Sequence, residues 1–530
     1  MTTPSTTLAR EVVTALVAAG VTEVVIAPGS RNAPLSFAVY DAAEAGLLRL
    51  HTRIDERSAG FLALGLTRGG ARAAVMSTSG TAVANLHPAV LEAAHAGLAL
   101  VVVTADRPAR LRGTNANQTT DQVGIFGRLV ETLDLIGPAP VGLSERLATC
   151  TAPVHVNAQL DEPLVPDGRW APVVERAEWP PPSSSAPATT IPAGPLTVVV
   201  AGDDAGPPAR VLAQRAGWPL LAEPTSGSRT GENALRCYRL LLDTELGERI
   251  ERVVVFGHPT LSRPVTHLLA RDDVEVLAVP AAGVWNNGAY RVDVVLDGTV
   301  EPECPDDPAW LESWRDADRA VARRLDALLA AEGGTTPHEV AGAVSRGVPP
   351  GGLLVVGASS PIRDLDLMVA KYAVGDRRKV IANRGLSGID GVVSTAIGAA
   401  LGRAHGSRNL ALMGDVTFLH DASGLVLGPH EPRPDLTIVV VNDDGGSIFA
   451  MLEQGDAAYA DRFDTLFGTP HGVDLASLCA ATRTPHWKVQ SVAELEHALA
   501  NPNGGIEVVE VAVRRDNRRG LDARIRALRP

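Results

Sequence analysis

The chain has 530 residues, too many for a single hydrophobic core, so about three domains are expected. Hydrophobic residues make up 45% of it, and 51 glycines and 38 prolines supply many turns, which indicates a globular α/β protein. The formal net charge of −13 argues against a general nucleic-acid binder or a protein that binds anionic membranes.

Cysteine usage and the N-terminus predict the cellular compartment. The four cysteines, Cys150, Cys237, Cys304 and Cys479, have no metal-type spacing, which is typical of a reducing compartment. The first 20 residues contain no basic segment before an apolar run, so no signal peptide is expected. Apolar stretches such as "GLALVVVTA" are far shorter than the roughly 20 residues that span a bilayer. We therefore expect a cytoplasmic protein without a membrane span.

Two breaks divide the chain. Residues 178–195 are rich in Pro and Ser and have no periodicity, which predicts a linker, and a weaker break lies near 330–340. The predicted domains are therefore 1–180, 195–330 and 340–530. Each contains continuous β-branched runs that lead through a Gly, Ser or Asn loop into a helical pattern, as in "LALVVVTADRP", "LTVVVAGDDAG" and "LTIVVVNDDGG". This pattern predicts an α/β fold with parallel sheets flanked by helices, where ligands bind beyond the carboxyl ends of the strands.

In the first domain, "IDERSAGFLALGLTRGG" places two acids before a helix that is apolar or small on nearly every face. Helix capping explains Asp55 as the N-cap and Glu56 in the first turn. The alternative is that Glu56 is a functional carboxylate in a dry pocket, where burial and a nearby charge adapt it to proton transfer.

Five arginines follow strands or lie in loops between elements. For any single one, a structural salt bridge or backbone contact is an alternative, but together they predict carboxylate binding, because Arg offers a planar bidentate fork. They are Arg31, Arg107, Arg263, Arg363 and Arg384.

In the last domain, acidic residues follow two consecutive strands. Asp415 follows one strand, and Asp443, in "NDDGG", follows the next, 28 residues later. Two acidic strand ends side by side can hold a divalent cation such as Mg²⁺, which takes further ligands from water and phosphate. Plain turn residues are the structural alternative for either acid alone.

This pair resembles the thiamine-diphosphate motif, in which GDG is followed some 25–30 residues later by Asn. The resemblance implies that Asp415, Asp443 and the Gly445 carbonyl hold Mg²⁺ or Mn²⁺ on the cofactor diphosphate. Val416 replaces the second glycine of the motif, and Asp443 stands where Asn is usual. The resemblance also implies that Glu56 activates the cofactor pyrimidine. In this family the two sites come from different subunits, which implies a homodimer or dimer of dimers with interfacial active sites.

Several segments are similar to one family, the 2-succinyl-5-enolpyruvyl-6-hydroxy-3-cyclohexene-1-carboxylate (SEPHCHC) synthases of menaquinone biosynthesis. They include "APGSRNAPL", "TADRPARLRGTNANQTTDQ", "NRGLSGIDGVVSTAIG" and "VVVNDDGGSIF", and they cover most of the first and last domains. The resemblance implies decarboxylation of 2-oxoglutarate on thiamine diphosphate and addition of the succinyl carbanion to isochorismate. The alternatives are another thiamine-diphosphate decarboxylase or carboligase of the acetolactate-synthase type, and a non-catalytic metabolite sensor.

The family resemblance assigns the site residues. The implied catalytic residues are Glu56, Arg31, Arg107, Gln118, Arg363 and Arg384. The implied substrate-binding residues are Ser30, Arg31, Arg107, Asn117, Gln118, Arg263, Ser359, Arg363, Ile448 and Phe449. The implied cofactor-binding residues are Glu56, Ser79, Gly80, Thr81, Asn383, Ile389, Gly414, Asp415 and Asp443.

Overall fold

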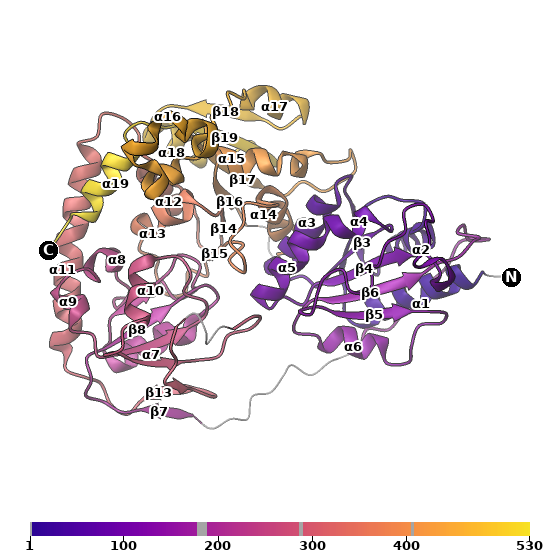
Figure 1. Ribbon diagram of the computed structural model, residues 1–530, viewed down its shortest axis with the longest axis horizontal. Helices are drawn as coiled ribbons and strands as arrows, with labels where there is room; N and C mark the ends of the chain where they lie inside the picture. Colours follow the sequence, from indigo (N-terminus) through magenta and orange to yellow (C-terminus); the bar gives the residue numbers. More distant parts are fainter. Residues whose placement is uncertain (1–2, 178–187, 286–289, 404–406) are drawn as a thin grey trace. The chain divides into compact units, whose positions relative to one another are not determined.

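The computed structural model describes residues 3–177, 188–285, 290–403 and 407–530 (Figure 1). Its contacts group the chain into two units. The first unit consists of Met1–Pro182, Gly385–Gly406 and His420–Asp435, and the second of Ser183–Arg384, Ser407–Leu419 and Leu436–Pro530. The three-domain division therefore stays a prediction, and each unit is described by itself.

The first unit contains a six-stranded parallel sheet in the order β2-β1-β3-β4-β6-β5. Its strands are β1 (Glu23–Ile26), β2 (Arg49–Thr52), β3 (Ala73–Ser77), β4 (Val101–Asp106), β5 (Glu131–Leu135) and β6 (Val154–Gln159). The helices of this unit are α1 (Pro4–Ala18), α2 (Ala33–Glu44), α3 (Glu56–Gly69), α4 (Thr81–Asn85), α5 (His87–Ala96), α6 (Leu143–Thr149) and α14 (Val392–Leu401). Apolar side chains of α1, α2 and α6 share one buried core with alternate residues of the strands, as the pleat requires.

The second unit contains two larger parallel sheets and a two-stranded one. The five-stranded sheet has the order β12-β11-β10-β8-β9, and the six-stranded sheet has the order β15-β14-β16-β17-β19-β18. The strands of the five-stranded sheet are β8 (Thr197–Ala201), β9 (Leu220–Ala222), β10 (Arg252–Phe256), β11 (Glu275–Ala278) and β12 (Val294–Val295). Those of the six-stranded sheet are β14 (Leu353–Val356), β15 (Lys379–Ile381), β16 (Asn409–Gly414), β17 (Leu436–Asn442), β18 (His486–Val489) and β19 (Ile506–Ala512).

Helices cover these sheets as well. Two cores alternate along β8 and β10, so both faces of the five-stranded sheet are buried, and α12, α13 and α18 pack on the six-stranded sheet. The helices of this unit are α7 (Pro207–Ala216), α8 (Tyr238–Leu241), α9 (Glu245–Glu248), α10 (Arg263–Leu269), α11 (Pro308–Ala330), α12 (Pro337–Gly347), α13 (Ser360–Met368), α15 (Asp415–His420), α16 (Ala460–Phe463), α17 (Leu475–Ala481), α18 (Val492–Ala500) and α19 (Arg518–Arg526). The predicted α/β fold with helix-flanked parallel sheets is confirmed.

The three larger sheets repeat one strand order. Numbered along the chain within each sheet, the first four strands lie in the order 2-1-3-4 in every case. In sheets of this kind the order reverses between the first and third strands, and ligands bind beyond their carboxyl ends at that point. Those ends are followed by Ser30 and Ser79 in the first unit and by Ser359 and Asp415 in the second.

Part of the predicted linker is ordered as a strand. Residues 178–187 of that linker lie outside the described residues, but β7 (Thr189–Ile191) pairs in parallel with β13 (Val300–Pro302). The interpretation of 178–195 as a linker throughout is therefore wrong at its C-terminal end. Its partner lies more than 100 residues away, so the local composition could not reveal the pairing.

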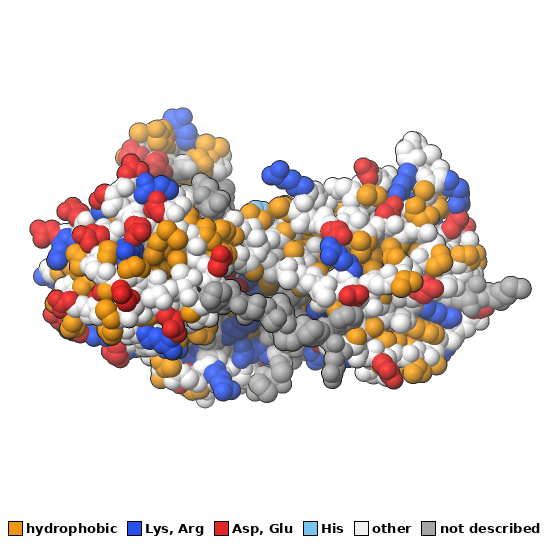
Figure 2. All heavy atoms as spheres, turned by 90° about the horizontal axis from the view of Figure 1, so that it is seen from below, with side chains coloured by type: hydrophobic (Ala, Val, Ile, Leu, Met, Phe, Trp, Pro, Cys, Tyr) orange, Lys and Arg blue, Asp and Glu red, His pale blue; other side chains and the backbone are white. Residues whose placement is uncertain are grey.

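The described part of the chain has a mixed surface. Figure 2 shows acidic and basic side chains interspersed with apolar ones on the face in view. Within the described residues, every helix is too short or too polar to cross a bilayer.

Candidate active site

Helix α3 begins with the two acids that the sequence singled out. The Asp55 carboxylate accepts hydrogen bonds from the backbone N–H groups of Arg57 (2.9 Å) and Ser58 (3.4 Å), so its predicted N-cap role is confirmed. Glu56 takes no part in that cap. It is half-buried, and its Oε2 accepts a hydrogen bond from Asn85 Nδ2 at 3.2 Å. Capping therefore explains Asp55 and leaves the Glu56 carboxylate available for another role.

Helix α3 is dry because α14 packs directly against it. A Cβ atom added to Gly65 would lie 2.3 Å from the Thr395 carbonyl oxygen, and one added to Gly398 would lie 2.2 Å from the Leu62 carbonyl oxygen. Both positions need glycine so that the two backbones can approach this closely. The apolar faces of α3 are thus covered, and Glu56 lies at the N-terminal end of a helix that is buried from Ser58 to Leu66.

The loop after β3 is held by a second loop of the first unit. Ser79 Oγ donates to the Gln118 carbonyl (3.0 Å), and Gln118 Nε2 donates to the Ser79 carbonyl (2.8 Å). Gly80, with φ of 76°, donates its backbone N–H to Gln122 Oε1 at 2.9 Å. The structure thus brings Ser79, Gly80 and Gln118 together, and the exposed Thr81 follows as the first residue of α4.

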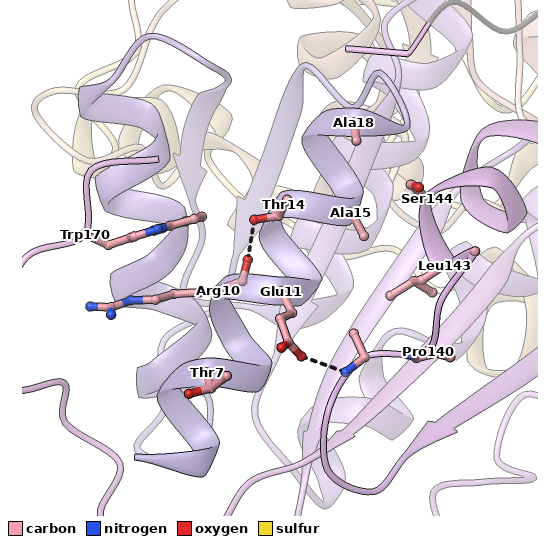
Figure 3. A pocket seen from close by; sticks show the side chains of 12 residues that line it. Thr7, Arg10, Glu11, Thr14, Ala15, Ala18, Pro140, Leu143, Ser144 and Trp170 are labelled. Atoms are coloured by element: carbon pink, nitrogen blue, oxygen red, sulfur yellow. Dashed lines mark hydrogen bonds between the residues drawn. The ribbon is translucent and has the colours of Figure 1, made fainter. Parts of the chain in front are cut away.

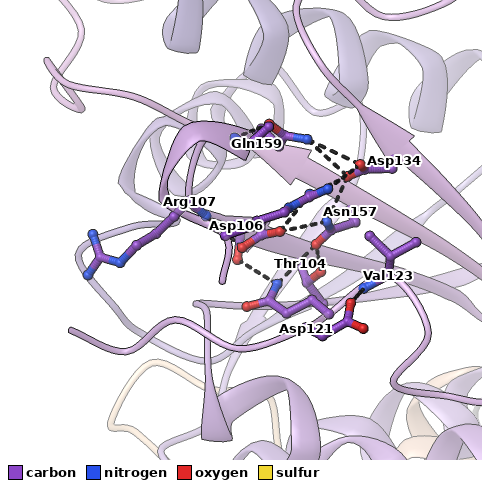
Figure 4. Close-up of polar contacts among 12 residues, drawn as sticks. Thr104, Asp106, Arg107, Asp121, Val123, Asp134, Asn157 and Gln159 are labelled. Atoms are coloured by element: carbon purple, nitrogen blue, oxygen red, sulfur yellow. Dashed lines mark hydrogen bonds and ion pairs between the residues drawn. The ribbon is translucent and has the colours of Figure 1, made fainter. Parts of the chain in front are cut away.

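A buried polar network lies at the carboxyl ends of β4 and β6 (Figure 4). Asp106 accepts hydrogen bonds from the Arg107 backbone N–H (2.7 Å), from Asn157 (2.9 Å) and from Arg112 (2.8 Å). Figure 4 shows the Arg107 side chain extending away from this network, and its Nε donates to the Asn117 carbonyl at 2.6 Å. The network thus fixes the backbone from which Arg107 projects.

Sequence reasoning missed three members of this network. Gln122 joins Gly80 to the Ala105 carbonyl (3.2 Å) and to Asn157 Oδ1 (3.0 Å). Arg112 and Gln122 lie in the segment "TADRPARLRGTNANQTTDQ", which was already singled out for other residues, whereas Asn157 carries no local signal. Their importance comes from contacts between separate strands.

Arg31 is buried beside other charges of the first unit. Its Nη1 donates to the Leu160 carbonyl at 3.0 Å. A structural backbone contact, the alternative to carboxylate binding, therefore accounts for one of its donors. Its buried Nε has no hydrogen-bond partner among the described residues. Burial lowers the pKa of Arg31, and the positive charge of Arg107 acts in the same direction, so the two guanidinium groups are near each other. The adjacent Ser30 is exposed.

In the second unit, Asp415 and Asp443 follow neighbouring strands, β16 and β17. Burial raises the pKa of Asp443 to about 7, a hydrogen bond from Ser447 opposes the shift, and the charge of Asp415 adds to it. Asp415 is buried and accepts hydrogen bonds from the backbone N–H groups of Val416 (2.7 Å) and Gly445 (2.9 Å). Two carboxylates that repel one another, one buried and one half-buried, fit a divalent cation, since its charge would relieve that repulsion.

The surroundings of this pair include a histidine that the sequence did not indicate. His471 Nε2 lies 3.1 Å from Asp415 Oδ2, and His471 Nδ1 lies 3.5 Å from Asp444 Oδ1. The Gly445 carbonyl, the third predicted ligand, accepts the Ser447 N–H at 3.1 Å. No metal-binding group of three or more His, Cys, Asp or Glu side chains occurs among the described residues. The predicted set contains two such side chains and a carbonyl, so that search does not test it.

The remaining predicted residues of the second unit include two neighbouring arginines, one buried and one half-buried, and a separate group nearer the surface. Arg384 is buried and donates to Thr260 Oγ1 at 2.7 Å, while Arg363 donates to the carbonyl of Ser359, a residue with φ of 74°, at 2.6 Å. Burial lowers the pKa of Arg363 most, and the positive charge of Arg384 lowers it further. The structure thus brings Arg363 and Arg384 together next to Ser359, and Asn383 precedes Arg384.

Arg263 is separate from that pair, because its exposed side chain forms an ion pair with Glu453 at 3.1 Å. Ile448 and Phe449 lie in a short 3₁₀ helix, Ser447–Met451, and the Phe449 ring is 5.8 Å from that of Phe467. Gly414 ends β16. Ile389 is half-buried in the first unit.

A hollow elsewhere in the first unit contains none of the predicted site residues (Figure 3). It is lined by α1 and the segment 139–144, where Glu11 accepts the Ala139 N–H at 2.7 Å. The candidate site is therefore built from the strand ends, not from this hollow.

Comparison with known proteins gives consistent matches. Residues 6–125 match a family model described as "Thiamine pyrophosphate enzyme, N-terminal TPP binding domain", and residues 365–511 match "Thiamine pyrophosphate enzyme, C-terminal TPP binding domain". The chain is 70% identical to the 2-succinyl-5-enolpyruvyl-6-hydroxy-3-cyclohexene-1-carboxylate synthase of Nocardioides sp., over 99% of this chain and 98% of that protein. It is 47% identical to the synthase of the same name from Kineococcus radiotolerans, with the same coverage. Identity to that from Mycobacterium marinum is 43%, over 99% of each chain.

Proposed function

The chain belongs to the SEPHCHC synthase family of thiamine-diphosphate enzymes that form carbon–carbon bonds, and from that premise we propose that it decarboxylates 2-oxoglutarate and adds the remaining succinyl group to isochorismate. The product is SEPHCHC, and the family name assigns the reaction to menaquinone biosynthesis. We place this activity in the cytoplasm.

The cofactor would be held by residues of two subunits. Asp415, Asp443 and the Gly445 carbonyl hold Mg²⁺ or Mn²⁺, and the raised pKa of Asp443 supports a cation there. When bound, thiamine diphosphate supplies a carbon nucleophile and accepts the electron pair left by the departing CO₂. The other proposed cofactor contacts are Ser79, Gly80, Thr81, Asn383, Ile389 and Gly414.

Glu56 holds the proton on the cofactor pyrimidine nitrogen. The observation that carries this proposal is that Asp55 alone caps α3, so the half-buried Glu56 carboxylate is not needed by the helix. Poor hydration at the end of an apolar helix favours proton exchange by this carboxylate. We propose that Glu56 serves the diphosphate site of a second subunit, in a homodimer or a dimer of dimers.

The arginines bind the substrate carboxylates. Ser359, Arg363 and Arg384 take those of 2-oxoglutarate, and the closeness of the buried Arg384 guanidinium to the half-buried one of Arg363 supports a dianionic ligand. Arg263, Ile448 and Phe449 complete the substrate contacts. Isochorismate contacts Ser30, Arg31, Arg107, Asn117 and Gln118, which places the acceptor double bond close to the reacting carbon.

The test measures CO₂ release and product formation from 2-oxoglutarate with and without isochorismate, in the presence of Mg²⁺ and cofactor. Glu56→Gln should lower kcat by about 10²- to 10⁴-fold, the usual contribution of a proton-transferring side chain. Glu145→Gln changes an exposed glutamate in the first turn of α6 and is the matched control. Near-normal turnover of Glu56→Gln would contradict the role of Glu56, and an acetolactate-type product would contradict the choice of substrates.

A further inference from the structure

Glu223 is a buried carboxylate of the second unit to which the reaction described above gives no role. It directly follows β9 and is only 2% exposed, and its backbone N–H donates to the Ala201 carbonyl at 2.9 Å. Its Oε1 accepts the backbone N–H of Leu261 at 2.9 Å, while Oε2 has no hydrogen-bond partner among the described residues. A buried acid with one satisfied oxygen costs stability, so its presence calls for an explanation.

The Leu261 amide belongs to the 257–263 loop, which follows β10 and ends with the first residue of α10. The base of this loop is fixed, because Asp203 and His258 exchange backbone hydrogen bonds of 3.0 and 2.9 Å. A Cβ atom on Gly257 would lie 2.3 Å from the Asp203 carbonyl oxygen, so the two backbones touch there. The Glu223 contact fixes the loop at a second point, four residues further along.

Between these two points the loop contacts Arg384, one of the five arginines that the sequence predicts to bind carboxylates. Thr260 Oγ1 accepts the hydrogen bond from Arg384 Nη2 at 2.7 Å, and Thr260 is the neighbour of Leu261. Arg384 is 3% exposed, and its Nε has no hydrogen-bond partner among the described residues. Its orientation therefore depends on where the loop places the Thr260 hydroxyl.

The charge around Glu223 is unusual. Burial raises its pKa to about 8, the charge of Arg384 opposes the shift, and Asp366 and Asp203 add to it. The group is therefore neutral near pH 7 and leaves the positive charge of Arg384 and Arg363 available. Above about pH 8 the ionised carboxylate would compete with a substrate carboxylate for Arg384.

We propose that Glu223 is a positioning residue which, through the Leu261 amide, holds the 257–263 loop so that Thr260 orients Arg384 toward a carboxylate of the 2-oxo acid substrate. The inference rests on the proposed function, and it gives the five-stranded sheet a part in recognising a dicarboxylate. Glu223 acts through Arg384 and touches neither substrate nor cofactor.

Two substitutions of Glu223 separate its hydrogen bond from its charge. Glu223→Gln keeps an oxygen acceptor for Leu261 and stays neutral, so its KM for 2-oxoglutarate at pH 7 should remain within about 2-fold of the unchanged protein. Glu223→Ala removes the acceptor and should raise that KM about 10-fold, with a smaller change in kcat. Glu251→Gln is the matched control: an exposed glutamate before β10 that accepts the Leu196 N–H at 2.8 Å, at the opposite end of the same sheet.

The pH profile distinguishes this role from a purely structural one. The KM of the unchanged enzyme should rise above about pH 8 as Glu223 ionises, and that of Glu223→Gln should stay flat. If Glu223→Ala fails to fold, Thr260→Val removes the acceptor for Arg384 and should give the same rise in KM. The affinity for glutarate, an unreactive dicarboxylate, is measured by calorimetry on each variant and should fall in parallel.

An unchanged KM in Glu223→Ala or Thr260→Val would overturn the inference, as would a rise above pH 8 that persists in Glu223→Gln. Either result with an active unchanged enzyme leaves the proposed function intact. If the unchanged enzyme releases no CO₂ from 2-oxoglutarate, the proposed function fails, and this inference fails with it.

Discussion

Asp106 and Asp443 lie at matching places in the two six-stranded sheets, because each follows or ends the fourth strand of the order 2-1-3-4-6-5. Asp106 is fully buried and accepts hydrogen bonds from Arg112, Asn157 and the Arg107 backbone. Asp443 has Asp415 as a neighbour, and burial together with that charge raises its pKa to about 7. The acid at this position is thus paired with a cationic side chain of the protein in the first sheet, whereas in the last sheet it needs a bound cation.

The difference shows how one fold divides two tasks. In the first sheet the charges satisfy each other, which makes a rigid base for Arg107 and the Ser79–Gln118 contact. In the last sheet the charges are unbalanced, which costs stability but favours the binding of a cation. Three experiments test or sharpen this contrast.

The largest effect is expected from removing the arginine that pairs with the acids of the first sheet. Arg112→Met leaves the buried Asp106 and the half-buried Asp134 without their cation, which should lower the free energy of unfolding by about 3 kcal/mol. Thermal unfolding measures this loss of stability. Arg110→Met is the matched control, because Arg110 forms an exposed ion pair with Asp161 and should change stability far less. Equal effects of the two substitutions would remove the distinction between the sheets.

A smaller effect is expected from removing one acid of the last sheet. Asp415→Ala deletes a proposed metal ligand and should weaken binding of Mg²⁺ and thiamine diphosphate by about 100-fold or more, or about 3 kcal/mol. Titration calorimetry measures this, and chelation of the metal should have the same effect on the unchanged protein. Asp461→Ala, which removes an exposed carboxylate of the same unit, is the control. Unaltered cofactor affinity in Asp415→Ala would reject the cation site.

The smallest effect concerns pH, and the two sheets should respond with opposite signs. Burial tends to raise the pKa of Asp134, but hydrogen bonds from Arg112, Asn157 and Gln159 lower it overall, so its contribution to stability is lost as pH falls below about 4. The pKa of Asp443 is raised, so its contribution is present at low pH and lost as pH rises toward 7.

Between about pH 5 and 7 the Asp134 contribution should stay constant, whereas the Asp443 contribution should change by at most about 1.4 kcal/mol per pH unit. Thermal unfolding without divalent cations should therefore show that stability falls less steeply with pH over this range in Asp443→Asn than in the unchanged protein. A steeper slope in Asp443→Asn would show that another group titrates there.

The sequence by itself determined the elements whose signal is local. The continuous apolar runs in "LALVVVTADRP", "LTVVVAGDDAG" and "LTIVVVNDDGG" each form a parallel strand, because strands buried on both faces need apolar side chains at every position. The Asp55 cap and the acids after β16 and β17 were also predicted from the sequence, since a cap and a strand end depend on residues close by in the chain. The strand β6, Val154–Gln159, was not predicted, because its buried His155 and Asn157 look incompatible with a core.

Only the tertiary structure decided which distant groups meet. His155 and Asn157 are tolerated because Thr104 lies within 2.7 and 3.0 Å of them, and Thr104 is some 50 residues away in the chain. The same holds for Gly65 against Thr395, His471 beside Asp415, and the path from Glu223 through Leu261 and Thr260 to Arg384. Local patterns encode the backbone preference and burial of a segment. The hydrogen-bond partner that offsets the desolvation cost of a buried polar group is brought to it only when separate surfaces pack together.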